Sequence, residues 1–280
     1  MTDIPIILEG YEAPIDPRIN RFKITPDPGV IEVNLHPSGS FSEIVEKTKT
    51  LYEEAELVRL TAEKFMIDGR HSGTGGGNHI TLGGINVSDS PFLRKPSLLR
   101  SLVAYWQNHP GLSYLFSGMF IGPTSQSPRI DEARNDSLHE LKIAFQQVDS
   151  SRFTPPWLMD RLFRNILVDL TGNTHSTEIS IDKLFDPGSL TGRLGLVEMR
   201  AFEMPPHYQM SVVQNAFMMA IICMFWESPY YGQPINSSTD LHARYMLPYF
   251  VYRDFKEVIR DLQNKGFHFM EKDFDTFFEF

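Results

Sequence analysis

Three short segments alternate between polar and apolar residues, which is the pattern of β-strands that each have one polar face. Side chains along a strand point to opposite faces in turn, so residues two apart share a face. The polar pairs formed in this way are Glu32 with Asn34, His79 with Thr81, and Glu198 with Arg200. Charged faces of this kind are costly unless they find partners. We therefore expect the polar side of the sheet to bind a ligand, and a metal–nucleotide site fits these residue types.

The N-terminal part of the chain predicts a strand and a hairpin. Residues 5–11 form a strand-like segment that carries Glu9. Residues 21–25 and 30–35 alternate as the two arms of a hairpin around residues 26–29, a run of proline, aspartate and glycine that favours a turn.

Helical spacing dominates most of the remaining chain. Ser40 and Glu43 form a capping box ahead of a helix expected to reach about Phe65. The other elements that the patterns predict are helices at 97–107 and 155–170, a strand pair at 179–181 and 194–202, and helices from 211 to the end with a loop at 227–238.

This order of elements predicts an α+β fold with a curved, mainly antiparallel sheet that helices cover on one face. We expect a single domain over residues 1–280. Its strands and first helices occupy 1–135, helices and late strands occupy 136–210, and a helical part occupies 211–280.

Composition narrows the function classes only a little. A net charge of −9 without a basic stripe argues against nucleic-acid binding. The single cysteine, Cys223, lies in the apolar run 216–226, where we expect a buried and inert thiol. That run is too short to span a bilayer, and no signal peptide is recognisable, so a cytoplasmic protein without a membrane partner is expected.

The glycine-rich run at residues 73–77 is the most unusual local feature. It is neither a Walker loop nor a dinucleotide fingerprint, because no Gly-Lys-Ser/Thr follows it and it opens a strand. Gly75, Gly76 and Gly77 would let the backbone approach a nucleotide or substrate closely. The loop at 118–130 is expected to be a connection rather than a functional loop. The stretch 129–134 is expected to be a solvated surface loop, with contact to a phosphate as the less favoured alternative.

The polar strand faces suggest a metal site beside a phosphate site. Two carboxylates, Glu32 and Glu198, with the imidazole of His79 suit Mg²⁺ or Mn²⁺ better than a closed zinc site. Arg200 shares a face with Glu198 and could neutralise phosphate charge. A purely structural Glu198–Arg200 pair is the alternative, and the sequence leaves it open.

The same three segments carry a family resemblance. Residues 77–83 resemble the Gly-x-His-Val-His-Val-Gly strand of carboxylate–amine ligases related to glutamine synthetase and glutamate–cysteine ligase. Residues 28–34 are similar to an early metal-binding strand of glutamine synthetase, and residues 196–200 are similar to the late Leu-Glu-Phe-Arg strand of that superfamily. Over nearly its whole length the chain resembles a bacterial family described as amidoligases of unknown function. In that family the segment usually follows a transglutaminase-like region in a longer protein.

The resemblance implies a fold like the catalytic domain of glutamine synthetase and an ATP-dependent reaction through an acyl phosphate. It implies Glu32, His79 and Glu198 as metal ligands, with Glu9 as a further ligand. Arg200 and Glu198 would act in catalysis. The list of implied nucleotide contacts is Arg200, Gly75, Gly76, Gly77 and His175. The chain departs from the superfamily at His175 and Ser180, where glutamine synthetase has arginines, and at Thr81, which replaces a second histidine.

Three functions remain open at this stage. The first is an ATP- and Mg²⁺-dependent ligase that joins a carboxylate to an amine, acting on small molecules or peptides. The second is a non-catalytic binding or scaffold domain whose ligase site is degenerate or incomplete. The third is a metal-dependent amide hydrolase that uses the same ligands without a nucleotide.

Overall fold

The computed structural model describes residues 23–279 apart from residues 28, 73, 118–121, 123–124, 135, 149–153 and 190–191. The chain separates into two compact units, Met1–Pro37 and Ser38–Phe280. The predicted strand at residues 5–11, with Glu9, lies outside the described residues.

The first unit contains the predicted hairpin. β1 (Lys23–Asp27) pairs antiparallel with β2 (Val30–Asn34), and the register joins Thr25 to Glu32. The turn includes Gly29, whose φ of +80° is a left-handed conformation that suits glycine. The hairpin prediction is confirmed.

The second unit begins with α1 (Phe41–Leu57), and its N-terminus is capped as expected. The Ser40 side chain accepts a hydrogen bond from the backbone of Glu43, and the Glu43 carboxylate accepts one from the backbone of Gly39. The predicted extension to Phe65 is wrong. The helix ends at Leu57 because Arg59 adopts a left-handed φ of +62°. The chain then forms a short ribbon of β3 (Lys64–Phe65) and β4 (His71–Ser72).

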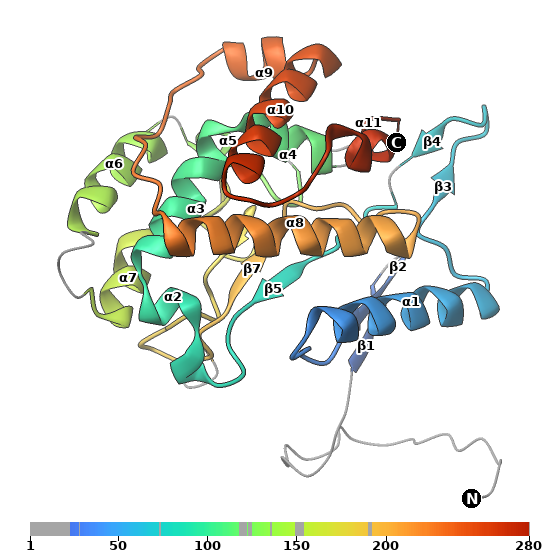
Figure 1. The fold of residues 1–280 in the computed structure, drawn as a ribbon, viewed down its shortest axis with the longest axis horizontal. Coiled ribbons are helices and arrows are strands. Elements are labelled where there is room, and N and C mark those ends of the chain that lie inside the picture. Colours follow the sequence, from blue (N-terminus) through green and yellow to red (C-terminus); the bar gives the residue numbers. More distant parts are fainter. Residues whose placement is uncertain are drawn as a thin grey trace, which may run out of the picture. The chain divides into compact units, whose positions relative to one another are not determined.

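A three-stranded antiparallel sheet lies at the centre of the second unit, with β7 (Val197–Met199) between β5 (Ile80–Leu82) and β6 (Ile179–Ser180). Segments more than 100 residues apart in the chain therefore lie side by side (Figure 1). The structure confirms a mixed helix and strand fold with antiparallel pairing. The sheets are small, because none in the described part of the chain has more than three strands.

Helices surround this sheet and supply most of the core. α8 (Tyr208–Glu227) packs against α1 and α3 (Ser97–Asn108), and α10 (Pro248–Asn264) packs against α4 (Pro110–Phe116). The shorter helices are α2 (Pro91–Arg94), α5 (Ile130–Ala133), α6 (Ser137–Gln147), α7 (Pro156–Phe163), α9 (Asp240–Tyr245) and α11 (Asp275–Glu279), and two 3₁₀ turns cover Val87–Asp89 and Glu271–Phe274. α7 ends seven residues earlier than predicted, because the chain turns there and buries Ile166 and Leu167 in the core.

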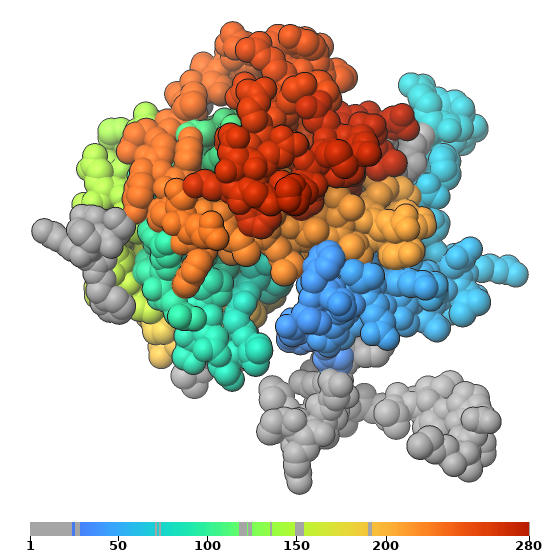
Figure 2. All heavy atoms as spheres, in the orientation of Figure 1, coloured from blue at the N-terminus to red at the C-terminus, as the bar shows by residue number. Residues whose placement is uncertain are grey.

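α8 is apolar on nearly every side, and half of it is buried within the fold. Its 20 residues would be enough to cross a membrane by length and composition, although core helices of soluble proteins meet the same criteria. The exposed side of α8 reaches the surface beside α1 (Figure 2). Cys223 lies on that exposed side, so the prediction of a buried thiol is wrong. The pKa of the Cys223 thiol is nevertheless raised, because neighbouring atoms keep part of the water away from the sulfur and because the negative charge of Glu227 is near.

Candidate functional site

The three-stranded sheet gathers the predicted polar residues of the second unit on one face. The strand register places Thr81 and Ser180 on either side of Glu198. Residues directly opposite each other in an antiparallel pair point to the same face. The same register brings His79 beside Arg200, and the apolar residues between them, Ile80 and Met199, are buried in the core.

Glu198 lies at the centre of a cluster of basic side chains. Its Oε1 is 2.8 Å from Arg200 Nη1 and 3.4 Å from His79 Nδ1, and its Oε2 is 3.2 Å from Lys183 Nζ. Burial raises the pKa of the Glu198 carboxyl, but the positive charges of Lys183 and Arg200 outweigh this effect. The pKa therefore lies below its usual value, and Glu198 is ionised at neutral pH.

Arg200 connects the cluster to His175. Nη1 of Arg200 is 3.1 Å from Nε2 of His175 and 3.3 Å from Nδ1 of His79. A guanidinium only donates hydrogen bonds, so a bond to His175 Nε2 places the proton of that ring on Nδ1. That nitrogen is 3.7 Å from Oδ2 of Asp182. Nε of Arg200 is buried and has no hydrogen-bond partner among the described residues, so one donor of this side chain remains available to a ligand.

The glycine run lies at the end of the same sheet. The backbones of Gly76 and Asn78 continue the ladder through hydrogen bonds to Met204 and Phe202. Gly75 has a left-handed φ of +82°. A Cβ at Gly77 would lie 2.6 Å from Cδ2 of His79 and closer still to its Nε2, so only glycine lets the imidazole occupy this place. No ligand contact of these glycines is described, and their role in nucleotide binding stays a prediction.

The predicted residues therefore fall into three groups. His79, Glu198, Arg200 and His175 come together on the sheet. Glu32 belongs to the first unit, where its carboxylate is exposed and accepts a hydrogen bond of 2.8 Å from Asn34. That contact agrees with the prediction that these two side chains share a face. Glu9 lies outside the described residues.

The cluster around Glu198 fits an anion better than a metal ion. Both oxygens of Glu198 contact cationic side chains, Arg200 and Lys183. Within the described ranges, no group of three or more His, Cys, Asp or Glu side chains is arranged to hold a metal. As they stand, the residues of the second unit do not fit a divalent cation, whereas arginine, lysine and imidazole groups are common ligands of phosphate and carboxylate.

Sequence reasoning missed Lys183 and Asp182, which complete the cluster. Both follow directly after β6, and the carbonyl of Lys183 accepts hydrogen bonds of 3.0 and 3.1 Å from the backbones of Leu194 and Leu196. Those bonds fold the chain so that the lysine side chain returns to Glu198. The only signal in the sequence is a basic residue just beyond the end of a predicted strand.

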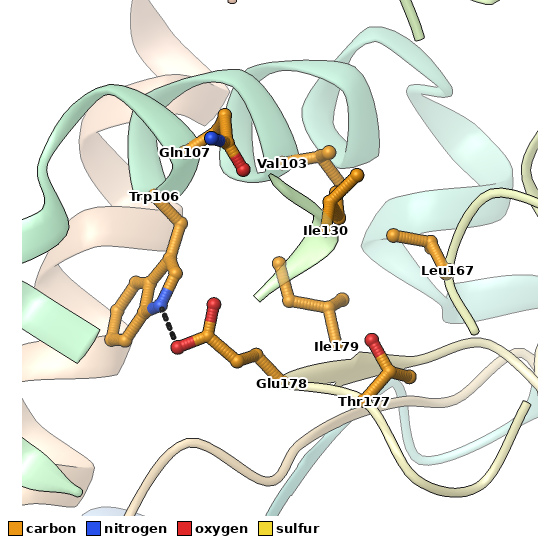
Figure 3. Close-up of a pocket in the computed structure, with 8 residues that line it drawn as sticks. All are labelled: Val103, Trp106, Gln107, Ile130, Leu167, Thr177, Glu178 and Ile179. Carbon is orange, nitrogen blue, oxygen red and sulfur yellow. Dashed lines mark hydrogen bonds between the residues drawn. The ribbon is translucent and has the colours of Figure 1, made fainter. Parts of the chain in front are cut away.

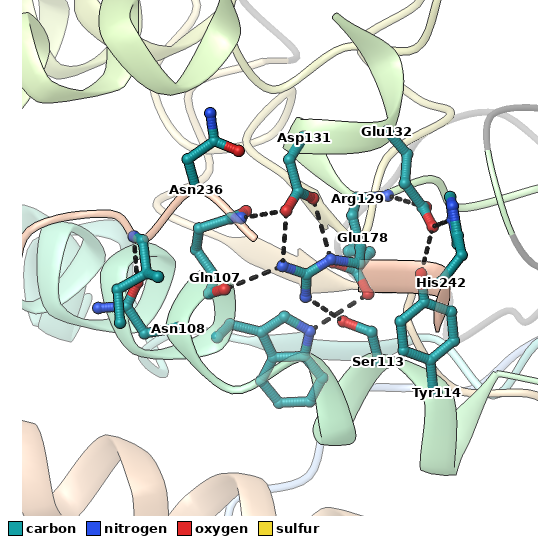
Figure 4. Close-up of polar contacts among 12 residues, drawn as sticks. Gln107, Asn108, Ser113, Tyr114, Arg129, Asp131, Glu132, Glu178, Asn236 and His242 are labelled. Carbon is teal, nitrogen blue, oxygen red and sulfur yellow. Dashed lines mark hydrogen bonds and ion pairs between the residues drawn. The ribbon is translucent and has the colours of Figure 1, made fainter. Parts of the chain in front are cut away.

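A second polar cluster lies in the interior, around Arg129 and Glu178 (Figures 3 and 4). The Arg129 guanidinium is buried and contacts Asp131, Ser113 and the backbone oxygen of Gln107. The prediction of a solvated surface loop at 129–134 is wrong. Residues Ile130–Ala133 form helix α5 with Ile130 and Ala133 buried, and the partners of Arg129 allow its charge to be buried as well. Burial also raises the pKa of Glu178 to about 7, against the opposing effect of Arg129.

Two cavities adjoin this interior cluster. One is lined by Trp106 and Glu178 (Figure 3), and the other by Ser113, Arg129 and Glu132. Each has a volume of about 10 Å³, which is room for roughly one water molecule. The cavities beside the interior cluster therefore leave no space for a substrate.

Comparisons with known proteins complete the description of the site. Neither the search of curated proteins nor the search of solved structures finds a match to this chain. A family model matches residues 1–280, the whole chain, and its description names an enzyme that forms amide bonds. The chain belongs to the family described as "Putative amidoligase enzyme (DUF2126)".

Proposed function

We propose that the protein is an ATP-dependent ligase that joins a carboxylate to an amine through an acyl phosphate. The observation that carries this proposal is the basic cluster on the sheet, in which Arg200, Lys183 and His79 contact a single carboxylate, Glu198. His175 joins this cluster through Arg200. Membership in an amidoligase family supports the formation of an amide bond. The sequence resembles ligases related to glutamine synthetase, and this resemblance implies their catalytic fold. The resemblance supports the use of ATP.

The proposed reaction has two steps. An oxygen of the substrate carboxylate attacks the γ-phosphorus of ATP, the bond from that phosphorus to the β–γ bridging oxygen breaks, and ADP leaves. The amine nitrogen then attacks the carbonyl carbon of the acyl phosphate, which releases inorganic phosphate and a proton from the nitrogen. The main requirement of the first step is that the protein stabilises the negative charge on the transferring phosphoryl group.

The residues of the cluster have distinct roles in this scheme. Arg200 and Lys183 contact oxygens of the transferring phosphoryl group, and the unpartnered Nε of Arg200 supplies one of the hydrogen bonds. Glu198 holds both cationic side chains in position before the nucleotide arrives. His175 orients the guanidinium from the other side, and Gly75, Gly76 and Gly77 leave room for the nucleotide near the sheet.

Mg²⁺ or Mn²⁺ enters the proposal together with ATP, as part of the substrate. Such an ion would offset negative charge on the phosphate oxygens. The assignment of Glu32, His79, Glu198 and Glu9 as metal ligands remains a prediction from the sequence. Titration of Mn²⁺ into the wild type and into a Glu32→Ala variant, with and without ADP, tests it. An unchanged affinity in the variant would remove Glu32 from the metal site.

The carboxylate and amine substrates are proposed as small molecules or peptides. The transglutaminase-like region found beside this segment in the resembling family is compatible with peptide substrates. Neither nucleic acid nor a membrane enters the proposal, and a cytoplasmic location remains the expectation from the sequence.

One observation favours a second candidate, a binding domain without catalysis. Glu198 is already ion-paired on both oxygens, which is also what a structural or degenerate site would show. Such a domain would bind an anion at Arg200 but would not hydrolyse or transfer its phosphoryl group. The metal-dependent hydrolase has less support. Among the described residues, no three His, Cys, Asp or Glu side chains are arranged to hold a metal ion.

The deciding experiment traps the acyl phosphate. The protein is incubated with Mg²⁺-ATP, hydroxylamine and a pool of amino acids and short peptides, and carboxylate-dependent ADP and hydroxamate are measured. We expect both products from the wild type and a loss of roughly 10²- to 10³-fold in Arg200→Ala. Arg253→Ala, a change on the exposed surface of α10, is the matched control. Binding of Mg²⁺-ATP without hydroxamate would favour the binding domain, and the absence of binding would refute both.

A further inference from the structure

A second carboxylate, Glu203, lies on the polar face of the sheet three residues after Arg200 in the chain. Glu203 forms an isolated antiparallel bridge with Gly77, and its backbone N–H donates a 2.8 Å hydrogen bond to the carbonyl of Phe116. Paired residues in an antiparallel bridge point to the same face. The Cβ direction of Gly77 points at the ring of His79, so this is the face that also bears Arg200 and Glu198.

The distance along the sheet follows from strand geometry. Gly77 and His79 are two residues apart, which is about 7 Å along a strand. Glu203 opposite Gly77 is therefore displaced by about two residue positions along the sheet from His79, which contacts Arg200. The anionic side chain lies on the side of His79 that faces away from Glu198 and Lys183.

The surroundings of Glu203 differ from those of Glu198. Glu203 is half-buried, and its carboxylate accepts a hydrogen bond from the backbone N–H of Thr74 in the glycine run. No basic side chain forms a salt bridge with it in the described part of the chain, whereas Glu198 has both Arg200 and Lys183. Burial raises the pKa of the Glu203 carboxyl because no neighbouring positive charge opposes it.

We infer that Glu203 binds the ammonium group of the amine substrate, opposite the anion-binding cluster across His79. This inference rests on the proposed function, because a ligase must hold an anionic phosphoryl donor and a cationic amine within reach of one carbonyl carbon. The basic cluster would repel an ammonium group, and a half-buried carboxylate without a cationic partner would attract it. The substrate class is therefore a primary amine that is protonated when it binds. This ammonium group must give one proton to water before its nitrogen, now with a free electron pair, attacks the acyl phosphate.

The hydrogen bond from Thr74 gives Glu203 a structural role as well, because it holds the start of the glycine run. A Glu203→Gln variant separates the two roles. The glutamine carbonyl still accepts the Thr74 hydrogen bond, while the negative charge that binds the ammonium group is gone. Glu203→Asp keeps the charge on a shorter side chain, and Glu257→Gln on the exposed surface of α10 is the matched control.

The first measurement compares the two half-reactions. Hydroxylamine is uncharged near neutral pH, so hydroxamate formation reports acyl phosphate without requiring an ammonium site. We expect Glu203→Gln to form hydroxamate like the wild type and to raise the KM for the amine roughly ten- to a hundredfold, with the KM for ATP unchanged. Partial recovery in Glu203→Asp would support a role for the charge. Equal losses in both half-reactions, or no loss in either, would overturn the inference and leave the ligase proposal standing.

The second measurement does not depend on catalysis. Saturation-transfer NMR detects binding of methylammonium chloride to the full chain, with sodium chloride at the same ionic strength as the reference. We expect a signal from the wild type and from Glu257→Gln, and its loss in Glu203→Gln. If the wild type makes no hydroxamate but binds methylammonium through Glu203, the ligase proposal fails and the ammonium site stands. Absence of a wild-type signal, or an unchanged signal in Glu203→Gln, would refute the site.

Discussion

Glu198 should be coupled to Arg200 much more strongly than to Lys183, although both contacts are short. The side chains of Glu198 and Arg200 are 8% and 6% exposed, whereas that of Lys183 is 46% exposed. Replacing Glu198 by glutamine leaves a buried guanidinium without its counter-ion, which costs about 3–5 kcal/mol. A charged hydrogen bond in such a place contributes about 1.5–3 kcal/mol, and a solvent-exposed ion pair about 0.2–1 kcal/mol.

A double-mutant cycle measures this difference. Glu198→Gln is combined with Arg200→Met in one cycle and with Lys183→Met in the other, and the midpoints of urea unfolding are compared at constant m-value. We expect a coupling energy of about 1.5–3 kcal/mol for Arg200 and below about 1 kcal/mol for Lys183. The exposed pair Arg134–Glu140, with a 2.7 Å contact and 43% exposure on both sides, is the control for distance without burial. Equal coupling energies for Arg200 and Lys183 would refute the argument that burial makes the Glu198–Arg200 pair the stronger one.

Three further outcomes follow from the structure. Gly77→Ala should displace the His79 ring and destabilise the protein by about 1–3 kcal/mol. The added methyl group of Gly75→Ala meets no neighbour, so this variant should lose only about 1 kcal/mol, because of its φ of +82°. Equal losses of stability in urea unfolding would contradict the clash with His79. The pKa of Glu178 is raised by burial from 4.5 to about 7, so the folded state resists ionisation. The stability of the wild type should fall relative to Glu178→Gln as pH rises from about 4.5 to 7, by up to roughly 3 kcal/mol, and a pH-independent difference would argue against a buried neutral carboxyl. Cys223 should react with a disulfide reagent in the native protein, more slowly than a free thiol because its pKa is raised; a requirement for denaturant would contradict its exposure.

The parts of the site that follow from local alternation could be predicted from the sequence. The period of two in residues 79–82 and 197–200 is enough to place His79 on the polar face of one strand and Arg200 on that of another. Their approach then needs only the pairing of those two strands, which the structure shows. The capping box at Ser40 is local in the same sense, and it was also predicted correctly.

The features that were missed depend on contacts between distant segments. Arg129 is buried because Ser113 and the backbone of Gln107 meet its guanidinium, and nothing in the sequence near Arg129 announces those partners. Cys223 lies on a helix that is apolar all around, so no periodicity shows which side faces solvent. The end of α1 depends on a single residue, Arg59, in a left-handed conformation that local propensity does not predict.

The neighbours of Glu198, rather than the carboxylate itself, decide which ligand the cluster accepts. A unit charge about 4 Å from another contributes roughly 4 kcal/mol at the effective dielectric of a protein surface, so a divalent ion at that distance from Arg200 would be repelled by about twice as much. A phosphate group has the opposite effect, because its oxygens are attracted by Arg200 and Lys183 and weaken their hold on Glu198. Under the proposed function, the carboxylate would become available to a metal only after an anion has taken over its two cationic partners. For this reason metal and nucleotide should bind to this cluster together, and a metal alone should bind weakly, since linkage requires each ligand to strengthen the other by the same factor.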